Sequence, residues 1–116
     1  MDIRENSEAF FKRLVKLEKA KKLLTKKKRC VLFKVIDGSS FVVNFQLEKV
    51  EVIDKPNLDS EVELKVESDS QTYRELFDGK ITPAEAYHAG RLFFDGIPYK
   101  GYPWLTRLIR ITQTGR

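Results

Sequence analysis

The hydrophobic residues of this chain change their spacing twice, and this change constrains the fold more than any other feature. Up to residue 27 they recur every three or four positions, which indicates an amphipathic helix. Over residues 31–67 they alternate with polar residues, as in strands that bury one face. Helical spacing returns from residue 68. The 116 residues therefore predict a single α+β domain, 1–116, because a second core would not fit in this length.

The first helix is predicted over residues 5–27 and carries the positive charge of the protein. Its apolar stripe consists of Phe10, Leu14, Leu17 and Leu24, and most of its lysines fall on the other faces. Residues 1–29 carry 11 basic and four acidic side chains, whereas residues 30–116 carry 11 basic and 13 acidic ones. The net charge of +5 is thus the sum of +7 in a basic amphipathic helix, 1–29, and −2 in the sheet and closing helices, 30–116.

Four successive strands are predicted after this helix, and their short connections favour an antiparallel meander. Their predicted bounds are 31–36, 41–47, 49–53 and 61–67. Asp37-Gly38 is a strong turn signal between the first two strands. In the last strand Val62, Leu64 and Val66 alternate with charged residues, which predicts one buried face and one face in water.

Two short helices, a fifth strand over 91–95 and a final helix over 104–111 are predicted next. The residues that bound the two short helices are Ser68–Ser70 and Gly79 for the first, and Thr82–Glu85 and Gly90 for the second. The resulting order is α-β-β-β-β-α-α-β-α. It predicts a five-stranded, largely antiparallel sheet with helices packed on one face.

Several motifs of the second half occur in an order and spacing that is typical of one family. They are Glu61–Glu67, Ser68-Asp69, Leu76–Lys80, Thr82–Tyr87 and Gly90–Gly96. With them the chain resembles the sterol carrier protein 2 family, the non-specific lipid-transfer domain, over about Val31–Ile111. The resemblance implies a sterol-carrier-like fold with a hydrophobic tunnel for a fatty acid, an acyl-CoA or an isoprenoid-like lipid. Two departures are Phe93, at a strand position that is usually polar in the family, and the aromatic, proline-rich segment 97–104.

The large side chains on the predicted inner faces are the candidate ligand contacts. They are Phe33, Phe41, Phe45, Phe77, Tyr87, Phe94, Trp104 and Leu108. An empty cavity costs about 24 cal/mol per Å³ in lost packing, and a bound acyl chain offsets this by about 0.8 kcal/mol per buried methylene. The same residues are also those of a packed core. The pattern therefore leaves open a lipid-transfer protein and a ligand-free accessory or interaction module of the same fold.

The basic end of the first helix is a second candidate site, for an anionic membrane surface. Its residues are Lys22, Lys26, Lys27, Lys28 and Arg29. A basic face opposite an apolar stripe suits anionic headgroups, and the resemblance implies membrane docking by the N-terminal helix. Merely solvated lysines are the alternative. Nucleic-acid binding is a third possibility, although no helix-turn-helix, zinc-finger or RNA-binding signature accompanies the basic run.

The sequence carries no pattern that indicates catalysis, a cofactor or a metal. His88 is the only histidine and has no serine or cysteine partner nearby, and Cys30 is the only cysteine, which excludes an internal disulfide. No phosphate loop or dinucleotide fingerprint occurs. No apolar run approaches the ~18 residues of a membrane span, and the N-terminus does not resemble a secretory signal. We therefore expect a soluble, cytoplasmic protein that is not an enzyme.

Overall fold

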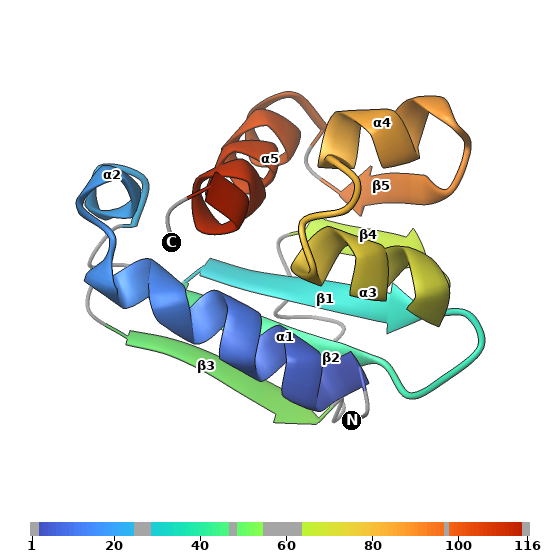
Figure 1. Ribbon diagram of the computed structural model, residues 1–116, viewed down its shortest axis with the longest axis horizontal. Helices are drawn as coiled ribbons and strands as arrows, with labels where there is room; N and C mark the ends of the chain where they lie inside the picture. Colours follow the sequence, from blue (N-terminus) through green and yellow to red (C-terminus); the bar gives the residue numbers. More distant parts are fainter. Residues whose placement is uncertain (1–2, 25–28, 47–48, 55–63, 97, 115–116) are drawn as a thin grey trace.

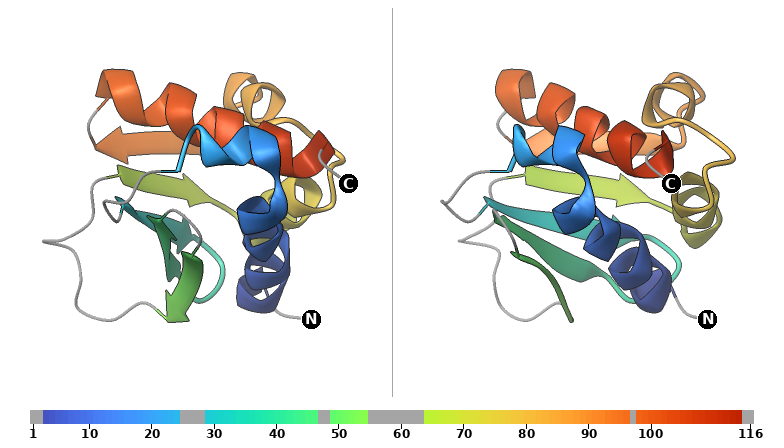
Figure 2. Two further views of the ribbon diagram at one scale, coloured as in Figure 1. Left: turned by 90° about the vertical axis from the view of Figure 1, so that its left-hand side faces the viewer. Right: turned by 60° about the vertical axis from the view of Figure 1, so that its left-hand side comes forward.

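Helices cover one face of a five-stranded sheet in the computed structural model (Figures 1 and 2). The structure describes residues 3–24, 29–46, 49–54, 64–96 and 98–114. Its elements are α1 (Ile3–Lys12), η1 (Arg13–Lys16), α2 (Glu18–Lys21), β1 (Arg29–Val35), β2 (Phe41–Gln46), β3 (Lys49–Asp54), β4 (Leu64–Ser68), α3 (Ser70–Phe77), α4 (Pro83–His88), β5 (Leu92–Gly96) and α5 (Pro98–Thr114). The predicted α+β class and the order of the elements are confirmed.

The strands are arranged in the order β3-β2-β1-β4-β5, with β1 at the centre. All neighbours are antiparallel except β1 and β4, which run parallel with Val31 opposite Leu64. The predicted meander is therefore wrong at its fourth strand, which lies beside β1 and not beside β3. This position gives β4 a hydrogen-bonded neighbour on each side, and it places Leu64 and Val66 in the main core with Val31 and Phe33.

The predicted continuous first helix is also wrong, because Leu17 interrupts it. Leu17 has an extended backbone (φ −96°, ψ 120°) between η1 and α2. A straight helix over residues 5–27 would be about 35 Å long, whereas the longest extent of the molecule is 32 Å. The interruption lets the chain turn, so that Phe10 near one end of the segment and Leu24 near the other are both buried in the same core.

The local helix signals are confirmed. The Asp69 carboxylate accepts a hydrogen bond at the start of α3. At the start of α4, the Thr82 hydroxyl accepts from the Glu85 amide at 3.1 Å, and the Glu85 carboxylate accepts from the Thr82 amide at 2.9 Å. Gly79 and Gly90 follow the two helices with φ of 76° and 72°, a backbone conformation that other residues rarely adopt.

The final helix is longer than predicted, since α5 begins at Pro98 and not at residue 104. Pro98 stands at the first helical position, where the missing amide hydrogen would have no acceptor within the helix. Pro103 lies inside α5 and removes one intrahelical hydrogen bond. From Pro98 on, the proline-rich segment is thus the first part of a helix.

Aromatic rings fill much of the main core, between the sheet and the helices. Phe33 of β1 stacks on Phe41 of β2 with 5.2 Å between ring centroids. Phe11 of α1 contacts Phe33 and Phe45 at 5.4 and 5.2 Å, and Tyr73 of α3 stacks on Phe77 at 6.0 Å. A smaller buried cluster lies on the opposite face of the sheet, formed by Cys30, Leu32 and Val42.

Candidate functional site

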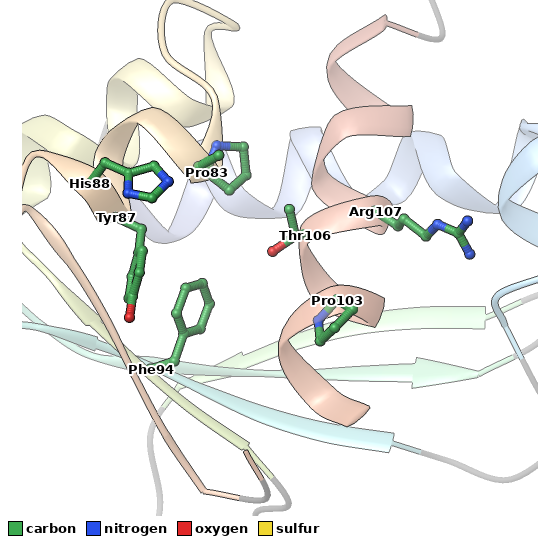
Figure 3. A pocket seen from close by; sticks show the side chains of 8 residues that line it. Pro83, Tyr87, His88, Phe94, Pro103, Thr106 and Arg107 are labelled. Carbon is green, nitrogen blue, oxygen red and sulfur yellow. The ribbon is translucent and has the colours of Figure 1, made fainter. Parts of the chain in front are cut away.

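A groove of about 460 Å³ opens between α4, β5 and α5, at the β5 edge of the sheet (Figure 3). The residues that line it are Pro83, Ala84, Tyr87 and His88 from α4, Phe94 from β5, and Pro103, Thr106 and Arg107 from α5. The groove lies on the helix-covered face, because Phe94 packs against the main core. Its position is therefore between the sheet and the closing helices.

Two aromatic side chains form one wall of the groove. The rings of Tyr87 and Phe94 lie 5.9 Å apart, and Figure 3 shows them opposite Thr106 and Pro103. Phe94 is opposite Val66 in the β4–β5 register, and the capping box fixes the start of the helix that carries Tyr87. Tyr87 nevertheless remains 54% exposed. An apolar molecule in the groove would cover this aromatic surface.

The few polar groups of the groove are basic or hydroxyl groups. Its lining contains His88 and Arg107 but no acidic residue. The Arg107 guanidinium points away from Tyr87 and Phe94, so the centre of the groove is apolar (Figure 3). This lining suits an apolar ligand that is held by contact area, with a few polar groups to orient it.

The chemistry of the groove offers little for catalysis or metal binding. No nucleophile paired with a base lines it. In the part of the chain that the structure describes, no group of three histidine, cysteine or acidic side chains is placed to hold a metal ion. The lowered pKa of the Glu85 carboxyl comes from the hydrogen bond that the Thr82 amide donates to it, and hence from the helix cap.

The eight predicted ligand contacts do not all meet at this groove. Tyr87 and Phe94 line it. Five others are buried in the main core, each at most 6% exposed: Phe33, Phe41, Phe45, Phe77 and Leu108. Trp104 lies elsewhere on α5. The prolines and small residues of the lining were not predicted, because their contribution depends on how α4 and α5 are placed relative to each other.

Trp104 lies where α5 meets the N-terminal segment. Its indole Nε1 donates a hydrogen bond to the Leu23 carbonyl oxygen at 2.7 Å. Its ring contacts Phe45 edge-on at 5.4 Å, and the Arg29 guanidinium carbon lies 4.1 Å from the ring centroid. Both views of Figure 2 show α2 beside α5 on the same side of the sheet. Trp104 therefore connects α5 to Leu23 near the end of the N-terminal helical segment and to Arg29 at the start of β1.

The structure describes part of the predicted basic surface. Lys22 is exposed after α2, and Arg29 is half-buried against Trp104. Lys26, Lys27 and Lys28 lie outside the described residues. Within the described ranges, no helix is both long and apolar enough to cross a membrane. Phe93 of β5 is 49% exposed, so this aromatic residue faces outward.

Solved structures share this fold at low sequence identity. A UbiJ-SCP2 ubiquinone synthesis protein is 16% identical, with a TM-score of 0.69 and 90% of each chain covered. A crystal structure of sterol carrier protein 2 is 15% identical, with a TM-score of 0.67 and 98% of this chain and 96% of that chain covered. The palmitated SCP2L2 of Aedes aegypti is 13% identical, with a TM-score of 0.64 and coverages of 97% and 95%.

The sequence itself also identifies the family. No curated protein matches the chain. The model of the SCP-2 sterol transfer family matches residues 8–97, which include every strand and all helices from α2 to α4. The match therefore extends over most of the chain and over all five strands of the described sheet, whose β5 edge carries the groove. This chain belongs to the SCP-2 sterol transfer family.

Proposed function

We propose that this protein binds an acyl lipid or another apolar ligand of similar shape in the groove between α4, β5 and α5, and that it transfers this ligand. The observation that carries the proposal is the groove itself. Its volume of about 460 Å³ lies within the roughly 300–1,000 Å³ that is usual for small-molecule sites. The family supports lipid binding in general, and the relative from Aedes aegypti was solved in a palmitated form.

The contacts in the groove favour an apolar chain over a polar metabolite. Tyr87 and Phe94 present aromatic surface on one side, and Pro103 and Thr106 face them across the groove. Each methylene that leaves water for this surface contributes about 0.8 kcal/mol. Because the groove is open to solvent, a ligand could enter and leave without unfolding of the core.

An anionic membrane surface is the proposed site of ligand exchange. The residues that would contact it are Lys22, Lys26, Lys27, Lys28 and Arg29. A basic residue near anionic headgroups contributes about 1 kcal/mol. Burial of the apolar stripe residues Phe10, Leu14 and Leu24 in the core leaves this attraction mainly electrostatic.

A second candidate function is that of an accessory module that holds no ligand. The observation in its favour is that five of the predicted ligand contacts pack in the main core, with Phe33 stacked on Phe41. The two functions differ in one measurable property, which is stoichiometric binding of an apolar molecule.

Ala84→Trp is the variant that tests the groove. Ala84 is exposed on α4 and lines the groove, so an indole there would occupy the space of a ligand without disturbing the core. Ala89→Trp is the matched control, because Ala89 is exposed at the end of the same helix and does not line the groove. We expect Ala84→Trp to weaken binding of a fluorescent fatty acid at least about tenfold, and Ala89→Trp to leave it unchanged.

Extraction of the purified protein with organic solvent, followed by mass spectrometry, provides an independent measurement. Stoichiometric lipid in the wild-type extract and its loss in Ala84→Trp would support the groove as the site. No lipid in the extract, together with no binding of the fluorescent fatty acid, would refute the carrier function and favour the accessory module. Equal binding by both tryptophan variants would refute the groove as the site.

A further inference from the structure

Trp104 forms contacts that link the groove to the basic part of the chain. Its indole Nε1 donates a hydrogen bond of 2.7 Å to the carbonyl oxygen of Leu23, the residue that follows the exposed Lys22. The guanidinium carbon of Arg29, the first residue of β1, lies over the indole ring at 4.1 Å from its centroid. Leu23 and Arg29, which are six positions apart in the basic part of the chain, thus both contact a single side chain of α5.

The same helix forms a wall of the groove. Pro103, adjacent to Trp104 in the chain, lines the groove together with Thr106 and Arg107 of the following turn. A helix turn moves as a unit, so a shift of Trp104 relative to the sheet also shifts these lining residues. The missing hydrogen bond at Pro103 makes this the part of α5 that bends most readily.

The contact between Arg29 and Trp104 is one that an anionic lipid surface can remove. A guanidinium over an indole is held by the electrostatic attraction of the ring. A phosphate offers the same guanidinium two charge-assisted hydrogen bonds, which are stronger. Arg29 is only half-buried, so it has access to such a competitor at the surface.

We propose that Trp104 is a positioning residue that couples contact with anionic phospholipid to release of the ligand from the groove. Anionic headgroups draw Arg29 away from the Trp104 ring, α5 loses this contact with β1, and the wall that carries Pro103 and Thr106 moves. This proposal rests on the proposed lipid-binding function of the groove. It adds the residue pair, Arg29 and Trp104, that transmits the contact with the membrane surface to the groove.

Thermodynamic linkage adds a second requirement. If anionic vesicles lower the affinity of the groove for its ligand by some factor, then the ligand lowers the affinity of the protein for those vesicles by the same factor. A coupling through Trp104 therefore has to appear in both measurements, and it has to disappear from both when the contact is removed.

The test measures transfer of a fluorescent fatty acid from the protein to phosphatidylcholine vesicles, with and without phosphatidylglycerol. We expect phosphatidylglycerol to accelerate transfer about fivefold or more for the wild type. Trp104→Phe keeps an aromatic ring against Phe45 but loses the indole donor and weakens the cation–π contact. It should bind the anionic vesicles as the wild type does, yet show less than about twofold acceleration.

Arg29→Gln is a second variant that tests the coupling if Trp104→Phe does not fold, because Arg29→Gln removes the guanidinium and leaves the indole in place. It should also show little acceleration. Lys65→Gln is the matched control, since Lys65 is an exposed cation on β4 that does not touch Trp104, and it should keep the full effect. Trp104 is the only tryptophan of the chain. Its emission should therefore change when anionic vesicles are added to the wild type, and not when they are added to Arg29→Gln.

The outcomes separate the two proposals. If the wild type binds no fluorescent fatty acid, the proposed function fails, and the coupling fails with it. If the wild type binds the probe but anionic lipid does not accelerate transfer, only the coupling is overturned. Undiminished acceleration in folded Trp104→Phe and in Arg29→Gln would overturn it as well.

Discussion

Phe93 and Phe94 are consecutive residues of β5 whose side chains lie on opposite faces of the sheet. Phe94 packs against the main core and lines the groove, whereas Phe93 is 49% exposed on the other face. Successive side chains of a strand point to opposite faces, so the two rings differ in environment but not in chemistry. The pair is therefore a natural internal control for the function of the groove.

Phe94→Ser should weaken binding of a fluorescent fatty acid about tenfold and lower the free energy of unfolding by about 1–3 kcal/mol, because a ring that packs on the core is lost. Phe93→Ser should leave the affinity unchanged and alter stability by less than about 1 kcal/mol. Fluorescence titration and urea denaturation measure the two effects. Equal loss of affinity in both variants would argue against the groove.

Replacing Lys26, Lys27 and Lys28 together with glutamate should abolish binding to vesicles that contain phosphatidylglycerol. Three cations contribute about 1 kcal/mol each near such a surface, and the new carboxylates are repelled by it. Vesicle co-sedimentation measures the loss. Lys65→Glu removes one exposed cation from the outer face of β4 and should change binding little.

A comparison of partners with the wild-type protein tests the nucleic-acid alternative. Binding of the wild type to duplex DNA and to RNA, compared with binding to anionic vesicles at equal ionic strength, separates the two kinds of partner. Tight binding to nucleic acid with weak binding to vesicles would contradict the membrane role of the basic segment. Salt by itself does not distinguish them, because it weakens both interactions.

Two carboxylates that accept hydrogen bonds at the start of helices, Asp37 from Ser70 of α3 and Glu85 from Thr82 before α4, predict a loss of stability in acid. The Ser70 amide, and next its hydroxyl, lower the pKa of Asp37, and the Thr82 amide lowers the pKa of Glu85. A carboxyl whose pKa is lower in the folded state stabilises the fold when it is ionised. This stabilisation is complete at a pH above the ordinary pKa, 3.8 for Asp37 and 4.5 for Glu85, and it is lost as the pH falls through the folded-state pKa.

Glu85→Gln should therefore make the free energy of unfolding depend less on pH in acid. The side-chain amide of the glutamine can still accept the hydrogen bond from the Thr82 amide, but it does not titrate. Urea denaturation above and below the pH window of these carboxylates measures the slope. Glu51→Gln removes an exposed carboxylate from β3 and serves as the control. If the free energy of unfolding of Glu85→Gln fell as steeply in acid as that of the wild type, this account of the cap would be contradicted.

Tyr73→Phe should lower the free energy of unfolding by about 1–2 kcal/mol. The Tyr73 hydroxyl lies 3.0 Å from the Lys34 carbonyl oxygen and 3.1 Å from that of Val66, so it can donate to either carbonyl of the β1–β4 pair. Burial raises the pKa of this phenol, which therefore stays protonated and able to donate. Tyr87→Phe is the control, because Tyr87 is mostly exposed, and its stability should change by less than about 0.5 kcal/mol.

Features that depend on neighbours in the chain could be read from the sequence. The reciprocal bonds of Thr82 and Glu85 follow from their spacing, and Gly79 and Gly90 end helices because they adopt positive φ. The alternation of Leu64, Lys65 and Val66 places one face of β4 in the core for the same local reason. The motifs in their order also indicated the family, which the match over residues 8–97 confirms.

Features that depend on distant parts of the chain were decided only in the folded molecule. The break at Leu17 lets Phe10 and Leu24 reach the same core, and β4 pairs with β1 across a long connection. The same limit applies to the sites. Sequence determined that large aromatic residues such as Phe33 and Phe94 face inward, but tertiary packing decided which of them fills the core and which lines a groove. A side chain's pattern fixes its face, whereas the space around it is set by elements that lie far away in the chain.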